Sequence, residues 1–140
     1  MSAGYSGTPL VKKLGLKPGQ RILILNPPEN YAATLGDLPD GLLQVETATP
    51  ELDFIQWFTK DRAELEQQFP DLKAALAPDG MLWISWPKKA SKVPTDLDEN
   101  LIREIGLRNG LVDVKVAAVD ATWSGLKFVY RLEDRPKIEL

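Results

Sequence analysis

Two residue types that carry much of enzyme chemistry are absent from this sequence. It contains no histidine and no cysteine among its 140 residues. Without them the chain has no imidazole base, no thiolate nucleophile and no metal site built on nitrogen or sulfur ligands. Any general base would be an aspartate, glutamate, lysine or tyrosine with a shifted pKa. We therefore expect no metal and assign no catalytic residue.

Long apolar runs and an excess of positive charge are also lacking. No run approaches the roughly 20 residues that cross a bilayer, and residues 1–9 lack the apolar stretch of a signal peptide. The absence of cysteine excludes disulfides and suits a cytosolic protein. With 17 basic and 20 acidic residues, the net charge of −3 does not favour nucleic acid. We expect a cytoplasmic, soluble chain that binds neither membrane nor nucleic acid, in an oligomeric state that the sequence leaves open.

Six segments have the composition of β-strands. The first, RILILN, is a continuous apolar run typical of a buried strand. The turn Pro78-Asp79-Gly80 is expected to open the fourth strand. Only residues 120–125 separate the last two, which predicts an antiparallel hairpin. The expected strands are residues 21–26, 42–46, 52–59, 81–86, 112–119 and 126–132.

Two longer helices are indicated by apolar residues at intervals of three and four, over residues 61–76 and 96–109. Pro70 is expected to kink or split the first helix. Thr95 is expected to cap the start of the second, and Gly110 to follow its end. Shorter helices are expected within residues 11–14 and 31–35.

Strands that alternate with helices predict an α/β fold of three layers, Rossmann-like, with a mostly parallel sheet of about six strands ending in an antiparallel hairpin. We expect one domain over residues 1–140, with an N-terminal segment at 1–14 and a loose tail at 133–140. About five residues separate the second and third strands, whereas a parallel crossover normally needs a dozen or more. Either the second strand is very short and its connection extended, or it is not parallel.

The order of elements resembles the class I S-adenosylmethionine-dependent methyltransferases. The segments LGLKPGQRILILN and LAPDGMLWISWPK look like that family's first strand and its helix-turn-strand five, and the final hairpin like its last two strands. Glu46 falls where the family has an acidic residue that binds ribose hydroxyls, and Asp53 where an aspartate often opens a strand. The resemblance implies a truncated methyltransferase-like fold, with S-adenosylmethionine as the cofactor.

The turn after the first strand departs from that family. Where the family has a glycine-rich turn that approaches the cofactor closely, this chain has Asn26-Pro27-Pro28-Glu29-Asn30. Prolines remove N–H donors and add bulk. A cofactor-dependent enzyme would need to use this altered turn, with Asn26 and Glu46 as its cofactor contacts.

A second resemblance covers nearly the whole chain. The segments GYSGTPLVKKLGLKPG, WPKKASKVPTDL and DATWSGLKFVYR look like a family of small uncharacterised bacterial proteins, described as a domain of unknown function. This resemblance implies the fold and supplies no activity.

The first candidate site is the loop that follows the fourth strand. Ligands of open α/β sheets bind at the carboxyl ends of the strands. Lys88, Lys89 and Ser91 lie in this loop, which leads to a helix start at Thr95. Lysines beside helix N–H groups favour an anion. The alternative is an ordinary solvated loop whose cap is already satisfied.

The second candidate is the hairpin loop, which contains Asp120, Trp123 and Ser124. Trp123 either stacks on a planar ligand or folds back as a lid on the core, with Asp120 and Ser124 shaping the turn. Our leading hypothesis is a non-catalytic domain that binds a small anionic ligand or a protein partner at these two loops and needs no cofactor. The alternative hypothesis is an enzyme that depends on S-adenosylmethionine or a nucleotide.

Overall fold

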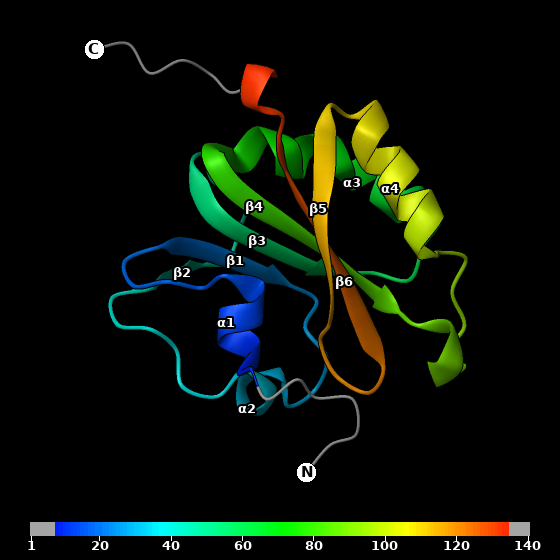
Figure 1. The fold of residues 1–140 in the computed structure, drawn as a ribbon, viewed down its shortest axis with the longest axis horizontal. Helices are drawn as coiled ribbons and strands as arrows, with labels where there is room; N and C mark the ends of the chain where they lie inside the picture. The colour runs from blue at the N-terminus through cyan, green and yellow to red at the C-terminus, as the bar shows by residue number, and fades with distance from the viewer. Residues whose placement is uncertain (1–7, 135–140) are drawn as a thin grey trace.

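A six-stranded sheet of order β2-β1-β3-β4-β6-β5 runs through the molecule (Figure 1). The computed structural model describes residues 8–134. Strands β2, β1, β3 and β4 are parallel, β6 is antiparallel to β4, and β5 is antiparallel to β6. The predicted mostly parallel sheet with a terminal hairpin is therefore confirmed. The strands are β1 (Arg21–Leu25), β2 (Leu43–Val45), β3 (Leu52–Phe58), β4 (Leu76–Pro87), β5 (Leu111–Ala118) and β6 (Trp123–Tyr130).

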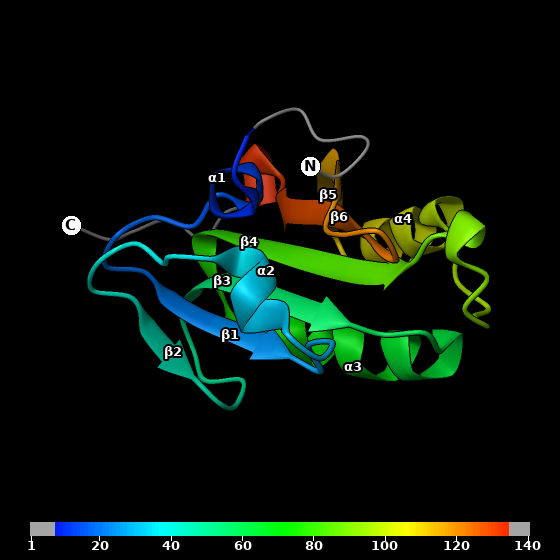
Figure 2. The same cartoon turned by 90° about the horizontal axis from the view of Figure 1, so that it is seen from below.

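Helices cover both faces of the sheet and complete the three layers. Apolar residues of α1 (Leu10–Leu14) and α2 (Tyr31–Leu35) pack in one core cluster, and those of α3 (Arg62–Ala75) and α4 (Glu99–Arg108) pack in the other. Figure 2 shows α1 and α3 on opposite sides of the sheet. Within residues 8–134, no helix is long and apolar enough to cross a membrane. Two single-turn helices, η1 (Lys89–Ser91) and η2 (Leu132–Asp134), follow β4 and β6.

The second strand is short and parallel, which answers the question that its short connection raised. Val45 pairs with Leu23 in β1, and Phe54 pairs with Ile22 on the other side. The connection at residues 46–51 must therefore run back by about three residues along the strand direction, about 10 Å, and cross β1, about 10 Å in the perpendicular direction. Both displacements together fall within the ~20 Å that six extended residues span. No further strand or helix fits between β2 and β3.

The fourth and sixth strands begin earlier than predicted. β4 begins at Leu76, so residues 78–80 form an irregularity within the strand and not a turn before it. Gly80 is required there because a Cβ atom would lie 2.7 Å from the carbonyl oxygen of Leu52. β6 begins at Trp123, so the hairpin loop is shorter than the predicted residues 120–125. Both errors arose because glycine and serine were interpreted as turn residues where strand pairing decides.

The helix bounds differ from the prediction most at the start of α4. α4 begins at Glu99, and its N-cap is Asp98, whose carboxylate accepts the N–H of Leu101 at 2.8 Å. The prediction that Thr95 caps this helix was therefore wrong. Pro70 lies inside α3 without splitting it. Of the predicted N-terminal segment at residues 1–14 and the predicted tail at residues 133–140, residues 1–7 and 135–140 lie outside the described residues.

Gly106 in α4 tests how tightly α4 packs on the sheet. A Cβ atom at Gly106 would lie 2.0 Å from Cε1 of the buried Phe128 ring. Alanine raises helix propensity by about 1 kcal/mol, but overpacking a core costs roughly 1–3 kcal/mol or more. We expect Gly106→Ala to lower the free energy of unfolding in urea by about 1–3 kcal/mol. Adding Phe128→Leu should recover part of that loss, and an unchanged or raised stability in Gly106→Ala would contradict the packing.

Candidate functional site

Three aromatic rings pack against one another near the carboxyl ends of the parallel strands. Tyr31 is the first residue of α2, Phe58 ends β3 and Trp123 begins β6. The Tyr31 and Phe58 rings meet edge to face at 4.8 Å between centroids, and Phe58 meets Trp123 likewise at 5.1 Å. Tyr31 and Phe58 are 4% and 2% exposed. We call these three residues the aromatic plug; they extend from the start of α2, which follows β1, across the end of β3 to the start of β6, near the strand ends where open α/β sheets bind ligands.

A chain of buried hydrogen bonds holds the plug to the sheet. The hydroxyl of Tyr31 donates to Oε1 of Gln56, and Nε2 of Gln56 donates to the hydroxyl of Ser85 at 3.2 Å. Gln56 and Ser85 are fully buried in β3 and β4. Burial raises the pKa of Tyr31 well above its ordinary value, so its hydroxyl stays protonated. Tyr31 is thus fixed as a neutral donor at the start of α2.

The turn that leads to Tyr31 keeps two left-handed backbone positions without glycine. Asn26 and Asn30 have φ angles of 53° and 64°, on either side of Pro27 and Pro28. Asparagine is among the few residues that adopt this conformation readily. The prolines between them donate no hydrogen bond. The turn is therefore ordered around residues that cannot offer the run of N–H groups expected of a glycine-rich cofactor loop.

A groove lies on the other side of the β1 end, between β1 and α3. One cavity of about 240 Å³ is lined by Asn26, Trp57 and Gln68 among others. It adjoins a cavity of about 580 Å³ that includes Glu46 and Asp71, and the two share Leu25, Gln68 and Leu72. We call the two cavities together the β1 groove. Asn26 and Glu46 border the same groove.

A second hollow lies beside the carboxyl end of β4. It measures about 650 Å³ and is lined by Lys88, Lys89, Lys92, Thr95 and Ser124, among others. We call it the rim hollow. Within residues 8–134, the ammonium groups of these three lysines form no ion pair and no hydrogen bond. The ion pairs in this part of the chain all use arginine.

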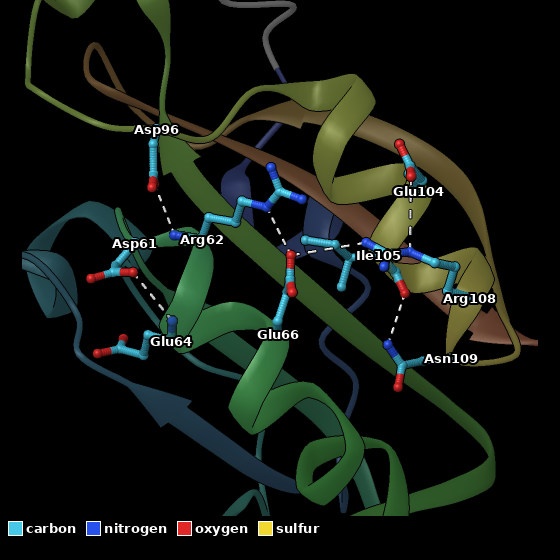
Figure 3. A network of polar contacts seen from close by, with 9 residues as sticks. All are labelled: Asp61, Arg62, Glu64, Glu66, Asp96, Glu104, Ile105, Arg108 and Asn109. Carbon is cyan, nitrogen blue, oxygen red and sulfur yellow. Dashed lines mark hydrogen bonds and ion pairs between the residues drawn. The ribbon is translucent and has the colours of Figure 1, made fainter.

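The three carboxylates that line the rim hollow have partners of their own. Asp96 accepts the N–H of Arg62 at 2.8 Å, which joins the start of α3 to the segment before α4 (Figure 3). Asp98 caps α4, and Glu99 pairs with Arg103 at 2.6 Å. Asp96 and Asp98 accept only backbone N–H groups and so keep their negative charges, whereas Glu99 is paired with a guanidinium. The three lysines of the hollow form no ion pair within residues 8–134.

The same region is tied together by a network of charges between α3 and α4. Glu66 of α3 accepts from Nε of Arg62 at 2.8 Å and lies 3.9 Å from Arg108 of α4 (Figure 3). Arg108 in turn lies 3.9 Å from Glu104. Such exposed pairs each contribute little to stability.

The remaining predicted site residues lie apart from the hollow or shape its surroundings. Ser91 donates its hydroxyl to the carbonyl of Lys88 at 2.6 Å, and so builds the turn. Asp120 accepts the N–H groups of Thr122 and Trp123. Trp123 packs in the plug, as the lid interpretation expected, and is on the opposite side of the sheet from the hollow that Ser124 lines. Thr95 donates to the carbonyl of Lys60 at 2.7 Å.

Sequence reasoning did not find Tyr31, Gln68 or Asp96 as site residues. Tyr31 was visible only as the first residue of a short helix, and no local pattern marks a tyrosine that packs in the plug. Gln68 lines the β1 groove from α3, and Asp96 joins two helices that are far apart in sequence. Both roles depend on tertiary contacts. Lys92 lines the rim hollow from the same loop as Lys88 and Lys89, so the sequence pattern that indicated those two lysines also indicates Lys92.

Solved structures of similar fold place the chain among class I methyltransferase-like folds. A TehB-like SAM-dependent methyltransferase from Corynebacterium glutamicum matches with a TM-score of 0.58 and 13% identity, over 87% of this chain and 85% of that one. A SAM-dependent methyltransferase from Aquifex aeolicus matches with a TM-score of 0.56 and 17% identity, over 85% of this chain and 86% of that one. The magnesium protoporphyrin IX methyltransferase of Synechocystis, with bound SAH, matches with a TM-score of 0.52 and 13% identity, over 87% of this chain and 78% of that one. At these identities the likeness shows the fold.

The family itself is shown by a sequence model. Residues 12–132 match the family described as "Protein of unknown function (DUF3052)", and the chain belongs to that family. A search among curated proteins finds no significant match. The two resemblances stated from the sequence, to a family of unknown function and to the methyltransferase fold, are both confirmed.

The buried Tyr31 hydroxyl predicts a stability that depends on pH. In Tyr31→Phe, Oε1 of Gln56 loses its donor, which should cost about 1–3 kcal/mol of unfolding free energy at pH 8. Above a pH of about 10, an unfolded tyrosine releases its proton while folded Tyr31 keeps it, so the stability of the wild type falls as pH rises. Urea unfolding between pH 8 and 11 should show a smaller fall in Tyr31→Phe. Equal slopes in both proteins would contradict a buried, neutral Tyr31.

Proposed function

We propose that this chain is a non-catalytic small-ligand-binding domain that has the methyltransferase fold and binds a small anion in the rim hollow. The observation that carries this proposal is the set of three lysines, Lys88, Lys89 and Lys92, around one hollow, none of which forms an ion pair within residues 8–134. An anion placed there would meet three ammonium groups, beside two carboxylates that point to backbone N–H groups. Lysine acts as a point charge toward phosphate, so a phosphate or carboxylate group is the chemistry that fits.

The aromatic plug supports the same proposal from the other side. Tyr31, Phe58 and Trp123 pack together near the strand ends where open α/β sheets bind ligands, and Pro27 and Pro28 lack the N–H groups that a glycine-rich loop would offer a cofactor. The chain has no histidine or cysteine to serve as base or nucleophile. A ligand-binding role asks for none of these features.

Binding of pyrophosphate tests the rim hollow directly. A ligand at 100 times its Kd stabilises the native state by about 2.7 kcal/mol, so pyrophosphate should raise the melting temperature of the wild type. Lys88→Ala/Lys89→Ala should abolish most of that rise. The matched control, Lys12→Ala/Lys17→Ala, removes the same amount of charge near α1 and should show the same rise in melting temperature as the wild type. An equal loss in the control, or an unchanged rise in Lys88→Ala/Lys89→Ala, would refute the placement.

The second candidate function is a domain that depends on S-adenosylmethionine or a nucleotide, and a specific observation favours it. Asn26 and Glu46 border one groove, and the left-handed Asn26 and Asn30 keep the backbone conformation that glycines would otherwise supply. Glu46 fits the role of a ribose ligand, because its exposed carboxylate follows β2 at the carboxyl edge. The turn and the plug do not fit close approach of the rest of the cofactor. No reaction step is therefore assigned to it.

Calorimetry with S-adenosylmethionine and S-adenosylhomocysteine separates the two candidates. The small-anion proposal predicts no saturable binding of either compound to the wild type. The cofactor candidate predicts binding that Glu46→Ala weakens at least tenfold, about 1.4 kcal/mol. Glu51→Ala, an exposed carboxylate on the same connection, serves as its control. Saturable binding that depends on Glu46 would replace the first candidate with the second.

A further inference from the structure

The β5–β6 hairpin forms one end of the sheet, and β5 is an edge strand. On one face, α4 covers the hairpin through Phe128 and an ion pair between Arg103 and Asp113 at 2.8 Å. On the other face, α1 packs on the end of the hairpin that contains Ala117 and Val119, and Nζ of Lys115 donates to the carbonyl of Lys13 in α1 at 2.8 Å. Residues 114–116 in the middle of β5 are exposed all the same.

Lysines gather on the face of the hairpin that carries α1. Lys127 of β6 lies directly opposite Lys115 of β5, and Lys17 follows α1 nearby. Burial lowers the pKa of Lys127, and the charges of Lys115 and Lys17 lower it further. Like charges directly opposite each other destabilise a strand pair. Within residues 8–134, none of these lysines has a carboxylate as an ion-pair partner.

The accessible edge of β5 alternates in chemistry. Lys115 shares its face with Lys127, whereas Val116 pairs with the buried Leu126 and belongs to the opposite face. Val114 and Val116 are 55% and 46% exposed. A strand added beside β5 would therefore place alternate side chains against a lysine face and against an apolar face.

The backbone of β5 can accept such a strand at Val116. Hydrogen bonds to β6 alternate along an antiparallel strand, and Val119 donates inward to Trp123. The polar groups of Val116 and Ala118 consequently face away from β6. The carbonyl of Ala118 already accepts Nζ of Lys13 at 2.9 Å, so α1 closes the edge at that end. The groups of Val116 are left to a partner.

Lysine on an edge strand usually prevents unwanted pairing, and here it excludes one partner in particular. A second copy paired through β5 around Lys115 would bring like charges together. An irregularity between Asp113 and Lys115 limits a long, regular pairing with any added strand. A short strand with carboxylates on the face of Lys115 and Lys127 meets attraction where a second copy meets repulsion, so the same lysines that reject self-pairing select an acidic partner.

We propose that the β5 edge binds an extended acidic segment of a protein partner, which adds a seventh strand with carboxylates facing Lys115 and Lys127 and apolar side chains facing Val116. This mode of binding takes its affinity from main-chain hydrogen bonds and its specificity from alternate side chains. The proposal does not depend on the ligand of the rim hollow, because it involves neither Lys88 nor Lys89.

A labelled eight-residue peptide of alternating glutamate and valine is the probe, measured by fluorescence anisotropy with the full chain. The wild type should bind it at least tenfold more tightly than the peptide with lysine in place of glutamate. Lys127→Glu should reverse that preference. Because Lys127 forms no hydrogen bond in the described residues and is repelled by its neighbours, this variant should remain folded. Lys60→Glu, an equal charge change on the loop after β3, should behave as wild type.

A second variant separates strand addition from simple charge attraction. Val116→Pro removes an outward N–H and leaves the lysines in place, and proline is tolerated at such edge positions. This variant should weaken binding of the glutamate–valine peptide at least tenfold. Urea unfolding would check that the variant is folded. Equal binding of both peptides, retained binding in Lys127→Glu, or full binding in Val116→Pro would overturn the proposal. Dimerisation of the wild type that Val116→Pro abolishes would also overturn it, because a second copy would then be the occupant. Binding to phosphatidylglycerol vesicles in place of the peptide would overturn it as well.

Discussion

The length of the connection between β2 and β3 constrains most of the structure. Residues 46–51 must pass β1 and enter β3 at its amino-terminal end, which leaves no chain for an intervening strand and helix. β2 can then be only a few residues long, because each further residue would lengthen the return. β2 stays largely exposed as a consequence. The β1 groove is the space that this short connection leaves.

Arginine and lysine have different surroundings in this structure. Arginine pairs with carboxylates around α3 and α4, where the planar guanidinium joins Glu66, Glu99 and Asp113. Within residues 8–134, the lysines of the rim hollow and of the hairpin form no such ion pair. The net charge of −3 gives no sign of this difference. A chain that is acidic as a whole therefore has two separate groups of lysines without ion-pair partners among the described residues.

The fold could be predicted from local patterns, because buried strands and helix stripes leave strong signals. Continuous apolar runs marked β1 and β3, and turn residues marked the hairpin of β5 and β6. The bounds failed where tertiary contacts decide: Trp123 belongs to a strand because it pairs with Pro87 and packs on Phe58. Lys88 and Lys89 were found as loop lysines beside a helix. The partners of the neighbouring carboxylates come from distant elements such as Arg62 and could not be predicted.

The position of β6 in the sheet sets an order on folding. β6 lies between β4 and β5, although it follows both in the chain. β5 has no direct neighbour other than β6, so it cannot join the sheet until the chain through Tyr130 has formed. Parallel pairing of β1, β3 and β4 does not wait for that event. During synthesis on the ribosome, the last part of the sheet therefore closes only after residue 130 has left the exit tunnel, and α4 remains without much of its packing surface until then.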